Sequence, residues 1–257
     1  MSGARLAASQ AAYHARALLR NPAVVFFSLV LPVLFLLIFA TIFGNETLDS
    51  RGGIKQSTLY VPGLIALGIV STTFVNLAIG LTVERENRTL KRLRGTPLPM
   101  PAFIAGRVAT ATVLALALTL ILLVIGSLAY GVTLPGATIP AAVVTVVVGV
   151  AALSCLGFAF TSVVPNEDAA PAVINAVVLP LYFISGVFFP TDEAPRWLND
   201  VASVFPVKHL AEALFTAFDP RTSGAGFEWG HLGIVALWGV AGLVLATRSF
   251  RWTPKGE

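Results

Sequence analysis

The chain has 257 residues, of which 56% are hydrophobic and only 12% are charged. A soluble domain carries about 25% charged residues, so this composition and a mean hydropathy of +0.83 exclude an ordinary soluble protein. The isoelectric point near 9.6 does not indicate nucleic-acid binding, because the basic residues flank apolar stretches and no soluble domain is present to carry them.

Six apolar stretches are long enough to cross a bilayer, which needs roughly 20 mostly apolar residues. We therefore predict an all-α integral membrane protein with one transmembrane domain over residues 1–257. The predicted spans are about 22–43, 59–83, 102–130, 140–164, 171–190 and 228–247.

The basic residues fix the predicted orientation, because cytosolic loops are rich in Lys and Arg. With both termini in the cytosol, twelve of the 17 basic residues are inside: Arg5, Arg16, Arg20, Arg85, Arg88, Lys91, Arg92, Arg94, Arg107, Arg248, Arg251 and Lys255. The other five are outside: Arg51, Lys55, Arg196, Lys208 and Arg221. We expect a multi-pass protein of a bacterial cytoplasmic (plasma) membrane, with Arg107 reaching the inner headgroups.

Residues 2–20 precede the first span and have the pattern of an amphipathic helix. Arg5, Arg16 and Arg20 fall in one sector, and alanines and leucines fall in the opposite one. Such a helix can lie on the inner leaflet with its basic side on lipid phosphates. The alternative is a frayed cytosolic tail.

The second span carries the polar residues Thr72, Thr73 and Asn76 at membrane depth. Polar groups at this depth face either other helices or a transport pathway, and the sequence leaves both alternatives open. Asn175 and Tyr182 in the fifth span complete the set of pathway candidates.

A charged run, Glu84–Pro101, follows the second span directly. On a helix over 84–96, Glu84, Arg88 and Lys91 would share one face, and Leu90 and Leu93 would form an apolar edge on another. This arrangement suits docking into the groove of a cytosolic partner. The alternative is a basic loop that contacts only lipid headgroups.

The segment 191–227, between the last two spans, contains two apolar stretches that are too short to cross. We predict short helices in the outer interface or dipping into it. Candidate residues for an outer gate are Ser185, Gly186, Pro190, Pro195 and Trp197.

The sequence contains no motif for ATP hydrolysis and no residue pattern for coupling transport to an ion gradient. No G-x-x-x-x-G-K-[ST] motif is present, and no Asp, Glu, Lys or His falls at the middle of a span, which argues against ion-coupled transport. The single Cys155 and the dispersed His14, His209 and His231 indicate no metal site. If the chain moves a compound uphill, another subunit must supply the energy.

Three stretches make the sequence resemble the membrane subunit (permease) of ABC type 2 exporters, near the drug-efflux branch. Glu84–Leu98 is similar to the pattern E-R-E-x-G-T-L-x-x-L-x-x-T-P, with Arg88 where the pattern has Gly. Ser185–Pro190 and Ala194–Leu198 resemble S-G-x-x-x-P…P-x-W-L. Phe205-Pro206 with the following apolar residues resembles the short outer helix before the last span.

The resemblance implies a permease that pairs with a second permease copy and with two separate ATP-binding subunits. It implies that the 84–96 segment is a coupling helix, with Glu84, Arg85, Glu86, Arg88, Lys91 and Leu93 as contact residues. It also implies outer re-entrant helices that line or gate the exit. The chain would bind no cofactor and would not be an enzyme by itself; ATP and Mg would be used by the partner ATPase subunit.

We therefore expect the permease of an ATP-driven exporter of an amphipathic or lipophilic compound, such as a drug or antibiotic, in contact with membrane lipid. Export of a lipid or a lipid-linked polysaccharide is an alternative within the same architecture. A sensor or scaffold that recruits a cytosolic partner without transport is the alternative from another class.

Overall fold

The computed structural model describes residues 3–43, 47–48, 54–95, 99–188 and 195–249. The described chain is helical apart from a two-stranded antiparallel ribbon of β1 (Thr47–Leu48) and β2 (Ile54–Lys55). The fold is therefore the predicted all-α class. Five of its helices are long and apolar enough to cross a membrane.

The first two of these long helices are composite. One is Pro22–Phe43, built from α2 (Pro22–Val25), the π-helical turn η1 (Phe26–Val30) and α3 (Leu31–Phe43). The other is Ser57–Glu86, built from α4 (Gln56–Val70), the π-helical turn η3 (Ser71–Val75) and α5 (Asn76–Glu86). Asn21 begins the first helix by accepting hydrogen bonds from the backbone of Ala23 and Val24, as expected of an N-cap residue.

The other three long helices are α7 (Met100–Tyr130), α8 (Ile139–Phe160) and α12 (Trp229–Ser249). α9 (Ala170–Ile184) lies in the predicted span 171–190 but has only 15 residues. The helix covers the first part of the predicted fifth span, of which residues 189–190 lie outside the described residues. The helix ends because Ser185 leaves helical geometry and Gly186 takes a φ of 78°, which reverses the chain direction at low steric cost.

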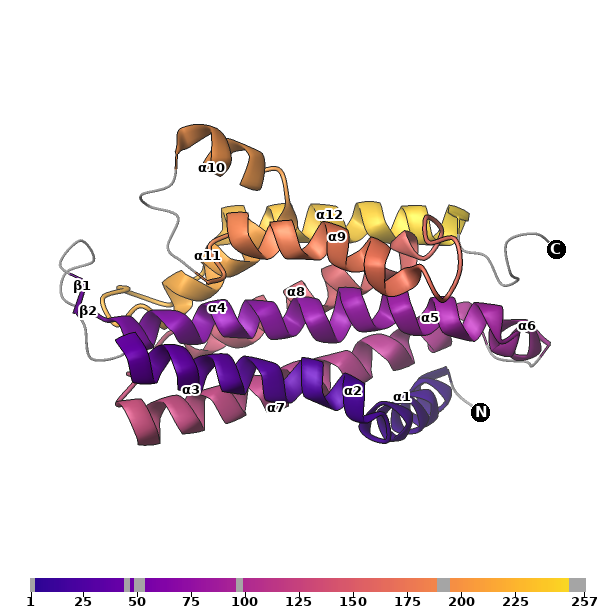
Figure 1. Ribbon diagram of the computed structural model, residues 1–257, viewed down its shortest axis with the longest axis horizontal. Coiled ribbons are helices and arrows are strands. Elements are labelled where there is room, and N and C mark those ends of the chain that lie inside the picture. The colour runs from indigo at the N-terminus through magenta and orange to yellow at the C-terminus, as the bar shows by residue number, and fades with distance from the viewer. Residues whose placement is uncertain (1–2, 44–46, 49–53, 96–98, 189–194, 250–257) are drawn as a thin grey trace.

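The long helices run side by side along the longest axis of the molecule (Figure 1). α6 (Thr89–Arg94), α1 (Gly3–Leu19) and the last turn of α12 lie at one end, here called the α6 end. The β1–β2 ribbon lies at the opposite end, here called the β end. α1 packs along α7 and is inclined to the bundle.

Small residues bring α8 and α12 into close contact. A Cβ atom on Gly239 would lie 2.8 Å from Ala152 Cα, and one on Gly242 would lie 2.8 Å from Leu156 N. Close backbone approach through glycine is typical of helices that associate in membranes, where packing replaces the hydrophobic driving force.

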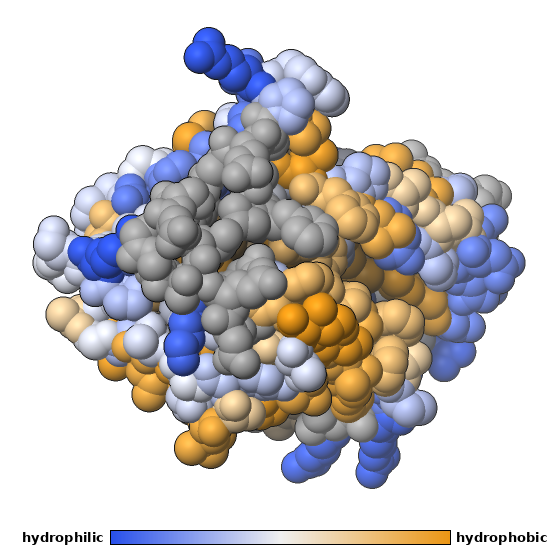
Figure 2. All heavy atoms as spheres, turned by 60° about the vertical axis from the view of Figure 1, so that its left-hand side comes forward, coloured by the Kyte–Doolittle hydropathy of each residue, from blue (hydrophilic) through white to orange (hydrophobic). Residues whose placement is uncertain are grey.

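The outer surface of the bundle is hydrophobic rather than polar. Large apolar side chains such as Val113, Leu128 and Leu237 are more than 60% exposed. Figure 2, in which the β end comes forward, shows wide hydrophobic areas between the hydrophilic groups. This surface fits a lipid environment.

The segment before α12 forms two short helices, α10 (Arg196–Ala202) and α11 (Pro206–Phe218), which meet at an angle of 100°. The corner is held by polar contacts: Lys208 Nζ donates to Asn199 Oδ1 at 2.8 Å, and Trp238 Nε1 donates to the Val204 carbonyl at 2.9 Å. These bonds satisfy groups that the bend would leave unpaired.

Two of the histidines that are far apart in sequence meet beside this corner. His209 Nδ1 and His231 Nδ1 are 2.8 Å apart, and His209 Nε2 is 2.8 Å from the Ser203 carbonyl. A carbonyl oxygen only accepts, so Nε2 of His209 carries a proton. The pair joins α11 to the first turn of α12.

Candidate functional site

The charged run at the α6 end is divided between two helices. Glu84–Glu86 are the last residues of α5, and α6 begins at Thr89. Between them Arg88 has a φ of 56°, the left-handed conformation that favours glycine. The prediction of one helix over 84–96, with Glu84, Arg88 and Lys91 on a common face, is therefore wrong, because the chain turns at Asn87-Arg88.

Arg85 is buried, with 2% of its surface exposed. Its guanidinium donates to the carbonyls of Thr161, Val164 and Pro165 at 3.0, 3.1 and 3.3 Å, and it pairs with Glu86 at 3.0 Å. These carbonyls follow the C-terminal end of α8, where a cation is favourable. Arg85 and Glu86 thus form a structural pair that fastens α5 to the α8–α9 turn. The burial of Arg85 speaks against its role as a partner contact, whereas the predicted role of Glu86 stays a prediction.

Glu84 also has an internal partner. Its Oε1 atom accepts from Arg107 Nη2 at 2.6 Å, and Arg107 Nη1 is 3.3 Å from His14 Nε2. Arg107 is only 8% exposed and lies over the Phe103 ring, so it does not reach the headgroups as predicted. The Glu84–Arg107–His14 cluster instead joins the end of α5 to α7 and α1.

Burial in this cluster keeps His14 neutral. Desolvation, and secondly the positive charge of Arg107, lower the pKa of His14 to about 3. A neutral imidazole can accept the Arg107 hydrogen bond through Nε2, whereas an imidazolium cannot. The attachment of α1 to α7 at this point therefore requires an unprotonated His14.

The leucine edge of α6 faces inward. Leu90 is 1% exposed and packs in a cluster with Leu81, Phe103 and Phe158, and Leu93 packs partly against the same cluster. Leu90 is therefore occupied by the chain's own core, whereas Leu93 is only partly buried and its role as a partner contact stays a prediction.

Within the charged run that follows α5, three basic residues that the structure describes are exposed: Arg88, Lys91 and Arg92, which we define as the coupling surface. Leu90 anchors this surface on the core from the opposite face of α6. Arg92 was not singled out from the sequence. Its position between Lys91 and Leu93, on a helix that starts at Thr89, would have placed it away from the Leu90–Leu93 edge and on the outward side.

The hydroxyls of Thr72 and Thr73 in the second span are engaged within their own helix. Thr72 Oγ1 donates to the Gly68 carbonyl at 2.8 Å, and Thr73 Oγ1 donates to the Ile69 carbonyl at 2.5 Å. Both side chains are at most 2% exposed. This back-bonding to the preceding turn is a known way for a helix to satisfy hydroxyls, and it favours the packing alternative.

The other pathway candidates link helices or lie apart. Asn76 Nδ2 donates to Ser28 Oγ at 2.6 Å, which connects the first residue of α5 to the π-helical turn η1. The Tyr182 hydroxyl is 3.0 Å from Ser71 Oγ and connects α9 to η3. Asn175 is exposed on α9. The five candidates therefore lie in separate contacts rather than around one cavity.

The outer-gate candidates occupy two places. Ser185 and Gly186 are buried at the end of α9, and Pro195 and Trp197 are exposed at the start of α10. Pro190 lies outside the described residues. Next to Gly186, the Val187 carbonyl approaches Gly63 so closely that no side chain fits there. This contact fixes the end of α9 against α4.

Within the described ranges, no group of three or more His, Cys, Asp or Glu side chains is arranged to hold a metal ion. The polar contacts of the described chain gather instead at the α6 end, between η1 and the start of α5, and at the α10–α11 corner.

The bundle of membrane-length helices, the short helix after the second span and the bent pair before the last define a multi-pass transport permease. Residues 11–218 match the family described as ABC-2 type transporter. The chain belongs to this family, and it is a multi-pass protein of the cytoplasmic membrane.

Three relatives illustrate the similarity. The chain is 31% identical, over 72% of its length, to the daunorubicin resistance ABC transporter permease protein DrrB1 of Streptomyces coeruleorubidus. It is 28% identical over 59% of its length to the probable multidrug ABC transporter permease YbhR of Escherichia coli K12, and 22% identical over 80% to the inner membrane transport permease YadH of the same strain. The matches span 64%, 41% and 76% of these relatives.

Proposed function

We propose that this chain is the membrane subunit of an ATP-driven exporter and that a separate ATP-binding subunit docks on the coupling surface Arg88, Lys91 and Arg92. The compound moved would be amphipathic or lipophilic, as the names of the drug-resistance relatives suggest. A second permease copy would complete the pathway, and ATP and Mg would be bound by the partner subunits.

The observation that carries this proposal is the way α6 is held. Leu90 buries one face of α6 in the core, and the charges of Arg88, Lys91 and Arg92 stay on the outside. Arg85 and Glu84 fasten the adjoining end of α5 to α8 and α7. A push on α6 is therefore transmitted to three helices that run the length of the bundle.

The proposed orientation places the α6 end in the cytosol together with both termini. Arg16, Arg20 and Arg248 are exposed at this end, in agreement with the excess of positive charge on cytosolic segments. The α10–α11 corner would then lie in the outer half of the membrane.

Charge reversal tests the docking surface. In Arg88→Glu combined with Lys91→Glu, we expect normal membrane insertion, loss of the co-purifying P-loop ATPase in mild detergent, and loss of efflux by cells. Arg196→Glu, a matched change on exposed α10, should retain both. A reversed variant that still captures the ATPase and exports normally would refute the docking assignment.

Substrate-dependent ATP hydrolysis separates the remaining alternatives. Purified complex in vesicles should hydrolyse ATP faster with amphipathic drugs than without them. Stimulation by a lipid or polysaccharide precursor alone would favour the lipid-linked export alternative. An assembled complex that hydrolyses no ATP under any condition would favour a scaffold.

A further inference from the structure

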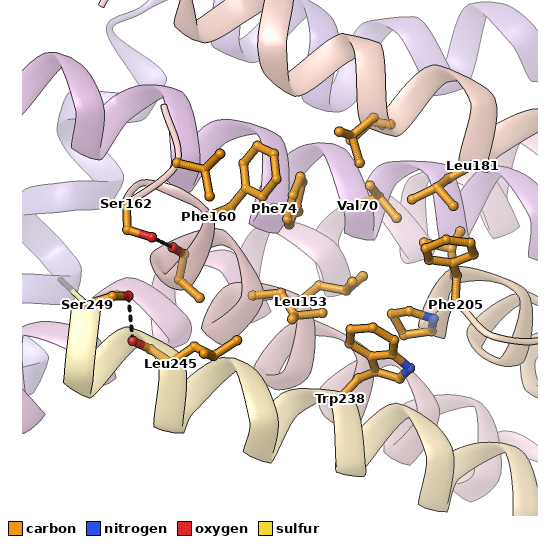
Figure 3. A pocket seen from close by; sticks show the side chains of 17 residues that line it. Val70, Phe74, Leu153, Phe160, Ser162, Leu181, Phe205, Trp238, Leu245 and Ser249 are labelled. Atoms are coloured by element: carbon orange, nitrogen blue, oxygen red, sulfur yellow. Dashed lines mark hydrogen bonds between the residues drawn. The ribbon is translucent and has the colours of Figure 1, made fainter. Parts of the chain in front are cut away.

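A cavity of about 420 Å³ lies between α4–η3, α8, α9 and α12 and is closed on one side by Phe205–Val207 (Figure 3). Its volume falls in the range of about 300–1,000 Å³ that is typical of ligand pockets. Apart from the bond of Trp238 to the Val204 carbonyl, none of the polar contacts described above involves a residue that lines the cavity. The cavity therefore needs its own explanation.

The lining is almost entirely hydrocarbon. Val70, Phe74, Leu153 and Leu181 point into the space from three elements (Figure 3). Two of the lining residues, Val163 and Val177, are 61% and 38% exposed, so the cavity reaches the hydrophobic outer surface of the bundle. A guest can thus enter from the surrounding bilayer.

The polar groups at the wall are already engaged. Ser162 Oγ donates to the Ala159 carbonyl at 2.8 Å, Ser249 Oγ donates to the Leu245 carbonyl at 2.6 Å, and the Trp238 indole donates to Val204. A guest rich in hydrogen-bonding groups would lose its hydration without replacement. The wall therefore favours a hydrocarbon guest over a polar drug.

The two ends of the cavity differ in the residues that line them. Ser162 and Ser249 lie together at one end, and Leu181, Phe205 and Trp238 lie at the other (Figure 3). Ser249 is in the last turn of α12, at the α6 end, and the exposed Arg248 precedes it. A cation at this end is complementary to the phosphate of a lipid whose chain enters the cavity.

We propose that the cavity binds one acyl chain of a phospholipid from the leaflet at the α6 end, with the lipid phosphate at Arg248. The bound chain would fill the space between α9 and α12 and contact Trp238, which holds the α10–α11 corner. The proposal depends on the membrane location of the chain and is independent of the compound transported.

The experiment uses Trp238 as the reporter. Trp197, Trp229 and Trp252 are replaced by Phe in the full-length chain, which leaves one indole in the cavity wall. Phosphatidylglycerol with a dibrominated acyl chain, which quenches tryptophan on contact, is titrated into the detergent-purified protein. We expect saturable quenching of Trp238 fluorescence at one lipid per chain.

A cavity-filling variant and a matched control decide the location. Val163→Phe with Val177→Phe fills exposed positions of the wall and should weaken the apparent affinity at least tenfold. Val147→Phe with Leu179→Phe adds the same side chains at exposed positions outside the wall and should leave the affinity unchanged. All four positions are surface-exposed, so the variants are expected to fold; unchanged size-exclusion profiles check this.

The headgroup is tested separately. Arg248→Gln should weaken binding of phosphatidylglycerol about fivefold, in keeping with one basic residue near an anionic lipid. Quenching that rises in proportion to lipid without saturating, or that is equal in the cavity-filling and control variants, would overturn the proposal. The proposal would also be overturned if quenching is saturable but Val163→Phe with Val177→Phe does not weaken the apparent affinity.

Discussion

Glu84 and Arg107, which are 23 positions apart in the sequence, form an ion pair with Oε1 and Nη2 2.6 Å apart. The pair joins the last turn of α5 to α7, next to the turn that leads into α6. The position of the coupling surface therefore depends on a contact between two helices and not on the charged run alone.

Breaking this pair should destabilise the protein. For Arg107→Met we expect a loss of about 2 kcal/mol, between the values for exposed and for fully buried pairs, since the Glu84 side chain is 30% exposed. Thermal unfolding in detergent measures the effect. Glu84→Gln with Arg107→Met should cost less than the sum of the single changes, and strict additivity would show that the two residues do not interact.

Replacement of Arg85 should cost more. Arg85→Met leaves the carbonyls of Thr161, Val164 and Pro165 without their donor, and we expect a loss of about 3 kcal/mol. Arg85→Lys should recover only part of it, because an ammonium lacks the planar fork of donors. Faster proteolysis of the α8–α9 turn, compared with an exposed Arg92→Met control, provides the readout; equal rates would contradict the prediction.

Arg88 is strained, and glycine should relieve the strain. A left-handed residue other than glycine costs about 1–2 kcal/mol, so Arg88→Gly should raise the unfolding free energy by about 1 kcal/mol. Lys91→Gly, within α6, should lower it by about the same amount. Both changes remove one charge of the coupling surface, so transport should fall in both while stability moves in opposite directions. A loss of stability in Arg88→Gly would refute this account.

Acid should release α1 from α7. The pKa of His14 is lowered to about 3 in the folded chain from 6.5, so the unfolded or detached form binds the proton more tightly. The stabilisation is complete above pH 6.5 and is lost progressively as the pH falls from 6.5 towards 3. Protease cleavage near α1, followed between pH 8 and 5, should accelerate in the parent protein and much less in His14→Gln. An equal pH dependence in both would contradict the role of His14.

Adding one methyl group where α12 packs closely on α8 should destabilise the protein. In Gly242→Ala the new Cβ would lie 2.8 Å from Leu156 N and 3.0 Å from Cys155 C, and we expect a loss of at least about 2 kcal/mol from overpacking. Gly233→Ala, on the same helix, meets no atom within 4 Å and should be neutral. Melting temperatures of the two variants give the comparison, and similar values would show that the helices separate easily.

Much of the fold could be predicted from the sequence. Windows of about 20 apolar residues are costly to leave in water, and their backbone must be hydrogen-bonded internally in lipid, so length and composition alone predict membrane-crossing helices. Two further segments could be predicted in the same way: the charged run after the second span and the short apolar stretches before the last one. Both are local features, because Pro and charged residues interrupt helices where they occur.

The candidate site was predicted only in outline. Arg85 and Arg88 are three residues apart and look equivalent in the sequence, yet one is buried among carbonyls and the other is exposed at a turn. The helix-face argument failed because it assumed a continuous helix, which the left-handed conformation of Arg88 interrupts. Local periodicity contains no information on which neighbouring helix accepts a given side chain.

The sequence by itself determined the class of protein, the positions of its apolar helices and the segment that carries the exposed charge, since these follow from local composition. Only the tertiary structure decided which of those charges are used internally, which histidines meet, where α9 stops and where a hydrocarbon-lined cavity remains. The physical reason is that each of these depends on the rotation and depth of helices relative to one another, and packing between distant segments sets both.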